Sequence, residues 1–150
     1  MKLSRVLGTL ACAPLSISLM GCVSTGAPKT SAQVVEDLQR EARAIAMGRG
    51  YDGSQVFNGG SLAERETGTL RFTLKGSERY IAIGLCDEQC KDIDLGVFDK
   101  DGFEIGSDTM EDAIPITELN PEKDGIAIFR LKMIRCDLQP CRYGVGVYGE

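Results

Sequence analysis

The chain has 150 residues, of which 43% are hydrophobic, 6% aromatic and 26% charged, with no histidine and no tryptophan. This length suits one domain with a core of its own once a targeting segment is removed. The net charge is −5, and without residues 1–21 the remaining 15 basic and 22 acidic residues leave −7. An acidic chain without runs of Lys or Arg argues against nucleic-acid binding, because phosphate recognition needs clustered cations.

Residues 1–21 have the pattern of an export signal. Two basic residues precede an apolar stretch from Leu7 to Met20, which is short and contains Pro14, so it predicts a signal peptide rather than a membrane span. The segment ends Leu-Met-Gly-Cys, which resembles the lipobox of bacterial lipoproteins. That resemblance implies cleavage before Cys22 and attachment of diacylglycerol to its thiol. The alternative is an ordinary signal peptide, whose cleavage would release a free secreted protein.

A lipid on Cys22 would anchor the chain to a membrane, since each buried methylene contributes roughly 0.8 kcal/mol. Val23 follows the cysteine instead of the Asp that retains some lipoproteins in the inner membrane. The resemblance therefore implies an envelope location, by default the outer membrane of a diderm cell. Residues 22–30 are small, polar and proline-containing, which predicts a flexible tether.

Residues 31–50 are predicted to form an amphipathic helix. Thr30 or Ser31 can cap its N-terminus, and Gly48 and Gly50 end it. Apolar residues at three- and four-residue spacing give it one apolar face, made by Val34, Val35, Leu38, Ala42, Ile45 and Ala46. Packing of this face on the chain's own domain is the favoured interpretation, and a surface for a partner is the alternative.

Residues 51–150 change to short β-rich runs separated by turn residues. Gly53, Asn58, Gly59 and Gly60 predict loops at the start of this region. Strands are predicted at 70–74, 80–85, 92–98, 103–106, 114–117, 125–135 and 142–148, with a tight hairpin turn at 99–102. Six to eight strands without intervening helices predict an all-β fold, an antiparallel sandwich or barrel.

Four of the six cysteines lie in the predicted β-domain, namely Cys86, Cys90, Cys136 and Cys141. An even number in an exported chain implies disulfides. Of the three pairings that can form, we favour Cys86–Cys90 and Cys136–Cys141, because each pair brackets a loop between strands that we expect to form a hairpin. The crossed pairings require both loops to meet at one end of the sandwich. A four-cysteine zinc site is the rival interpretation, but its usual spacing is tighter.

Several short motifs follow one another in order between Arg79 and Gly149. They are Cys86-Asp87 after an apolar strand, Asp92-Ile93-Asp94-Leu95, Phe98-Asp99-Lys100-Asp101-Gly102, and Met133-Ile134-Arg135-Cys136 leading to Pro140-Cys141-Arg142-Tyr143. This set resembles the bacterial pre-peptidase C-terminal (PPC) domain family, in its cysteine-containing version. The resemblance implies a jelly-roll β-sandwich, export from the cell, and a role in secretion or in binding substrate polymers.

No catalytic residues are predicted. The chain lacks His, the commonest general base and metal ligand, and its serines lie in no nucleophile-elbow motif. We therefore expect a non-catalytic envelope lipoprotein whose sandwich is a binding or structural module. Its expected partners are the membrane, through the lipid on Cys22, and an envelope protein or polymer. The alternative is a secreted hydrolase, or a hydrolase accessory domain, that uses the acidic loops.

Calcium is the one cofactor that the acidic loops favour, since it takes six to eight hard oxygen ligands. Its predicted ligands are Asp87, Asp92, Asp94 and Asp99. The run at 99–102 shares a fragment with calcium loops but lacks their later ligands. A type I turn explains the same run without a metal, so the expectation is no cofactor, with calcium as the alternative.

Overall fold

One helix and eight strands make up the part of the chain that the computed structural model describes, residues 27–53 and 55–150. They are α1 (Ser31–Gly48), β1 (Gln55–Leu62), β2 (Thr67–Leu74), β3 (Tyr80–Cys86), β4 (Cys90–Phe98), β5 (Glu104–Asp108), β6 (Ile116–Leu119), β7 (Gly125–Cys136) and β8 (Cys141–Gly149). Every strand pair is antiparallel. The predicted all-β class, with one helix ahead of it, is confirmed.

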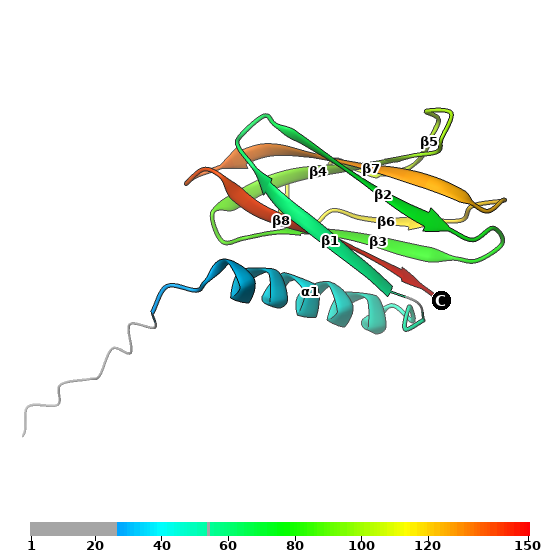
Figure 1. Cartoon of the computed structure of the whole chain (residues 1–150), viewed down its shortest axis with the longest axis horizontal. Coiled ribbons are helices and arrows are strands. Elements are labelled where there is room, and N and C mark those ends of the chain that lie inside the picture. Colours follow the sequence, from blue (N-terminus) through cyan, green and yellow to red (C-terminus); the bar gives the residue numbers. More distant parts are fainter. Residues whose placement is uncertain (1–26, 54) are drawn as a thin grey trace, which may run out of the picture.

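The strands form two four-stranded sheets packed face to face (Figure 1). Sheet I has the order β1-β8-β3-β6, and sheet II has the order β2-β7-β4-β5. Only β4 and β5 are consecutive in the chain and adjacent in one sheet, so every other connection crosses from one sheet to the other. Eight strands in this double-sheet order have the jelly-roll arrangement.

Helix α1 lies along the outer face of sheet I (Figure 1). A capping box starts the helix, because the Gln33 backbone N–H donates to the Thr30 hydroxyl and the Thr30 N–H donates to the Gln33 side chain. Leu38, Ala42 and Ala46 are buried against the sheet. The predicted apolar face therefore packs on its own domain, as the favoured interpretation stated, except that Val35 is exposed.

Strand β3 is apolar on both faces because it lies between two layers. Tyr80 and Ala82 point into the core between the sheets, while Ile81, Ile83 and Leu85 pack under α1. The core between the sheets also takes the inward residues of sheet II, among them Leu95, Phe129 and Leu131. Sheet I therefore packs against sheet II on one face and against α1 on the other.

Nowhere in the described residues is a helix long and apolar enough to cross a membrane.

Strand β1 corrects the sequence prediction, which assigned loops to its glycines. Gly59 is the register partner of Gly144 on β8. A Cβ atom on Gly59 would lie 2.1 Å from the Tyr143 carbonyl oxygen, so any larger residue would collide with the neighbouring strand. Glycine at this position permits a close approach of two backbones rather than a turn.

Strand β6 is an edge strand of sheet I, as predicted, but it begins two residues later than expected. Pro115 precedes it, and the Pro115 carbonyl accepts a hydrogen bond from the Gly84 N–H of β3 at 2.8 Å. Pro115 has no N–H of its own to donate to a ladder, so regular pairing starts only at Ile116.

Candidate functional site

Two disulfides are present, Cys86–Cys90 and Cys136–Cys141, with Cα–Cα distances of 5.8 and 5.9 Å. The sequence favoured these two pairs, but it did so because each pair was expected to bracket the loop of a hairpin, and that reason is wrong. The strands that flank each bridge are not hairpin partners, because β3 and β8 belong to sheet I while β4 and β7 belong to sheet II. Each disulfide therefore closes a corner where the chain passes from one layer of the sandwich to the other.

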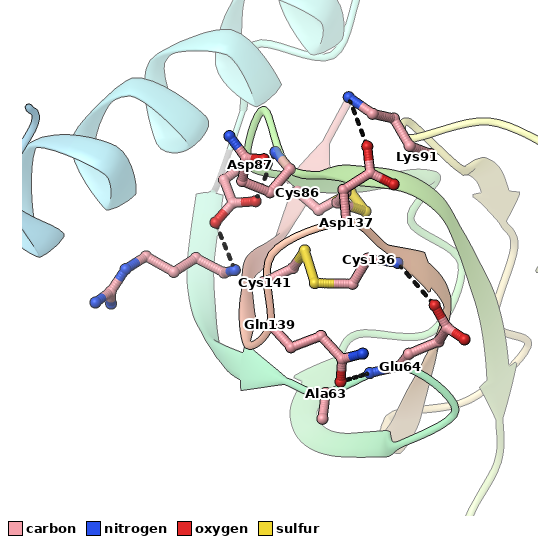
Figure 2. Close-up of a disulfide and its surroundings, with 12 residues drawn as sticks. Ala63, Glu64, Cys86, Asp87, Lys91, Cys136, Asp137, Gln139 and Cys141 are labelled. Carbon is pink, nitrogen blue, oxygen red and sulfur yellow. Dashed lines mark hydrogen bonds and ion pairs between the residues drawn. A yellow bond between two sulfur atoms is a disulfide. The ribbon is translucent and has the colours of Figure 1, made fainter.

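The two corners meet at one end of the sandwich, which we call the disulfide end. Cys90 and Cys136 are register partners on β4 and β7. The Arg142 N–H donates to the Asp87 carboxylate at 2.8 Å, and the Asp87 N–H donates to the Arg142 carbonyl at 2.9 Å (Figure 2). The close approach that crossed pairings would require therefore exists, although the local pairings are the ones formed.

The β1–β2 corner joins the same end. The Glu64 N–H donates to the Gln139 side chain at 3.0 Å, and the Cys136 N–H donates to the Glu64 carboxylate at 3.5 Å (Figure 2). Lys91, next to Cys90, and Asp137, next to Cys136, make an exposed ion pair at 3.7 Å (Figure 2). Polar side chains here satisfy the backbone of three loops, which is a structural role.

The four aspartates predicted to bind calcium do not form one site. Asp87 is engaged at the disulfide end, and the Asp99 carboxylate accepts two backbone N–H groups, each at 2.9 Å, within the β4–β5 turn. Asp92 and Asp94 lie in the first half of β4, and seven residues of extended chain separate Asp92 from Asp99 by about 23 Å. In the ranges that the structure describes, no three acidic, cysteine or histidine side chains are grouped to hold a metal ion.

Asp92 is nevertheless unusual, because it is 9% exposed and its buried Oδ1 atom has no hydrogen-bond partner among the residues that the structure describes. Burial raises its pKa above the ordinary carboxyl value, and the nearby charges of Asp94 and Glu111 raise it further, while Arg135 opposes them. Burial also raises the pKa of Asp94, against the effect of Lys132. Asp92 lies on β4 near Glu111 and Asp112, and neither Asp92 nor Asp94 lines the groove described next.

A groove of about 710 Å³ lies at the opposite end of the sandwich, between the β4–β5 turn and the segment 120–125. Its charged groups are mixed, and several serve the loops themselves. Lys100 pairs with Asp101 at 2.6 Å, and the Gly76 N–H donates to Asp124 at 2.8 Å. These two contacts stabilise the turns that form the walls of the groove.

The outer face of sheet II is a different kind of surface, and sequence reasoning did not single it out. On β2 the exposed side chains are Thr67, Thr69, Arg71 and Thr73, and on β7 they include Ile126, Arg130 and Lys132. The Arg130 guanidinium lies over the Phe98 ring, 4.4 Å from its centroid. The alternation of Arg71 and Thr73 with Leu70, Phe72 and Leu74 was visible in the sequence, but not that β7 lies beside β2.

No protein-family model matches this chain, and no curated protein matches it significantly. What the structure establishes is a β-sandwich domain with two disulfides, consistent with an extracytoplasmic module, since such bonds persist in oxidising compartments.

Proposed function

We propose that this protein is a lipid-anchored envelope protein whose sandwich is a non-catalytic binding module, with the outer face of sheet II as its binding surface. One observation carries the proposal. Helix α1 covers the outer face of sheet I, whereas in the described part of the chain no helix covers sheet II (Figure 1). An antiparallel sheet commonly leaves one face to solvent, and here that face combines cationic, hydroxyl and apolar side chains.

The position of residues 27–29 supports an anchor at the disulfide end. Lys29 pairs with Asp37 of α1 at 2.8 Å and lies 4.0 Å from Glu88 of the β3–β4 corner. The five residue steps from Cys22 to Ala27 span at most about 18 Å. An acylated Cys22 would therefore keep the disulfide end near the bilayer, with the face of sheet II directed to the side.

The resemblance to PPC domains supports the same role. The jelly-roll order agrees with the fold that the resemblance implies, and the two disulfides suit the export that it implies. A PPC-like module on a lipid anchor would hold a polymer or an envelope protein close to the membrane. Asp92, Asp94 and Glu111 do not line the groove between the β4–β5 turn and residues 120–125. Their position outside it supports a structural rather than a catalytic interpretation.

Mass spectrometry of the membrane fraction tests the anchor. The expected product starts at Cys22 and carries the mass of diacylglycerol, with or without a third acyl chain on its amino group. A Cys22→Ser variant is the matched control, since it lacks the acceptor thiol and is expected to lack the lipid. A mature wild-type chain with an unmodified Cys22 would overturn the proposed anchor.

A further inference from the structure

Two arginines on the outer face of sheet II form a pair that spans two strands. Arg71 on β2 is the register partner of Ile128 on β7, and Arg130 follows two residues later on the same face. Such diagonal neighbours in an antiparallel pair lie about 7–8 Å apart. The two arginine side chains therefore stand at adjacent positions on one face of the sheet.

Neither arginine is neutralised by a neighbouring carboxylate. Across residues 27–53 and 55–150, the ion pairs include neither Arg71 nor Arg130. The Phe98 ring supports the Arg130 guanidinium from one side. A stacked guanidinium keeps its edge N–H groups free, and these can hold a carboxylate in a bidentate manner. The guanidinium groups of Arg71 and Arg130 are therefore available to bind anions.

Hydroxyl and apolar groups surround the arginine pair. Thr69 is the register partner of Arg130, and Thr73 is the register partner of Ile126. The Ile126 side chain is 51% exposed, and Ile128 beside it is half-buried. The face of β2 and β7 therefore offers cations, neutral hydrogen-bonding groups and apolar area side by side.

A sugar polymer with carboxylates matches this combination. Its carboxylates suit the arginines, its hydroxyl groups suit the threonines, and the apolar faces of its rings suit the isoleucines. A nucleic acid fits less well, because its dense phosphates need more cations than this face presents and the remaining chain is acidic. An acidic peptide would use the arginines but has no hydroxyl-rich rings for the rest of the surface.

We infer that the outer face of sheet II binds an acidic polysaccharide, with Arg71 and Arg130 holding carboxylates of its uronic-acid units. This inference rests on the proposed function, because it assigns a ligand class to the same binding surface. Thr69 and Thr73 bind sugar hydroxyls, and Ile126 and Ile128 contact the ring faces.

Calorimetric titration of the mature full chain, purified in a nonionic detergent at low salt, tests this assignment. The probe is a soluble polygalacturonate oligomer, and its methyl ester is the uncharged comparison. Arg71→Gln and Arg130→Gln are each expected to raise Kd by about tenfold or more, the equivalent of one charged hydrogen-bonding contact. Arg49→Gln is the matched control, since it removes the same charge from the exposed end of α1 and is expected to leave Kd unchanged.

Four results would overturn the inference. They are no binding of polygalacturonate, equal binding of the methyl ester, equal weakening by Arg49→Gln, and binding of polyglutamate as tight as that of the sugar polymer. Circular dichroism of each variant establishes that the β-sandwich is intact. The mass spectrum of the same preparation reports the lipid on Cys22, so that a failed anchor and a failed ligand assignment are told apart.

Discussion

Asp87 and Arg142 hold each other through two hydrogen bonds that join residues 55 positions apart in the chain. The Asp87 carboxylate accepts from the Arg142 N–H at 2.8 Å, and the Asp87 N–H donates to the Arg142 carbonyl at 2.9 Å. Each disulfide closes only a short local loop and does not link the two corners. The Asp87–Arg142 hydrogen bonds connect the β3–β4 corner to the β7–β8 corner.

Asp87→Asn is expected to lower the free energy of unfolding by about 1–3 kcal/mol, because hydrogen bonds to a charged acceptor are lost in a half-buried position. An Asn side chain keeps one acceptor oxygen, whereas Asp87 uses one oxygen for the Gln89 N–H and the other for the Arg142 N–H. Urea unfolding followed by circular dichroism measures the change.

Glu88→Gln is the matched control for this prediction, since it makes the same chemical change at the next residue. The Glu88 side chain is exposed and makes a 4.0 Å ion pair with Lys29, which contributes little to stability in water. Equal stability losses in Asp87→Asn and Glu88→Gln would contradict the role assigned to Asp87.

Removal of either disulfide is expected to destabilise the domain by about 2 kcal/mol, from the chain entropy of loops of five or six residues. The two double variants are Cys86→Ala/Cys90→Ala and Cys136→Ala/Cys141→Ala. Denaturant unfolding of each, compared with wild type in the absence of reductant, measures the loss. Four titratable thiols in the mature wild-type protein would contradict the structure at this end.

Asp92→Asn is expected to stabilise the protein at neutral pH. Because the pKa of folded Asp92 lies above its ordinary value, the folded state binds this proton more tightly than the unfolded state does. The wild type therefore loses stability as the pH rises from the ordinary carboxyl pKa through the folded pKa. Asn does not titrate, so the advantage of the variant grows over that pH range and then becomes constant.

Urea unfolding of wild type and Asp92→Asn from acid to neutral pH tests this dependence. The groups that face Asp92 are Asp94, Glu111, Asp112 and Arg135, and all are kept in both proteins. Asp52→Asn, at an exposed position, controls for the change in net charge. A stability difference between wild type and Asp92→Asn that does not vary with pH would count against the raised pKa.

Gly144→Ala is expected to cost about 1–3 kcal/mol through overpacking. A Cβ atom at Gly144 would lie 2.2 Å from the Phe57 ring, which packs over β8 on the α1 side of sheet I. Gly48→Ala is the control, because a Cβ atom there meets nothing within 4 Å. Thermal unfolding of both variants measures the difference, and Phe57→Leu is expected to recover part of the loss in the Gly144→Ala background. No recovery would show that the Phe57 contact is not the cause.

The local pattern of the sequence predicted most elements of the fold. Alternation placed β2, β4 and β7 within a few residues of their observed bounds, and Thr30 or Ser31 marked the start of α1, where the structure has Thr30 as the cap. These features depend on residues close together in the chain. Strand β1 was not predicted because Gly59 and Gly60 are typical of loops. The reason for glycine at 59 is the backbone of β8, which lies more than eighty residues away in the chain.

By itself, the sequence determined the β-class and the capped helix, since each follows from periodicity or spacing over a few residues. It favoured the local cysteine pairs but left the crossed pairings open. Only the tertiary structure decided that the disulfides close corners between two sheets, that Asp87 meets Arg142, and that Arg71 lies beside Arg130. Which strand lies next to which depends on pairings between distant segments, and the alternation within one strand does not encode its neighbour.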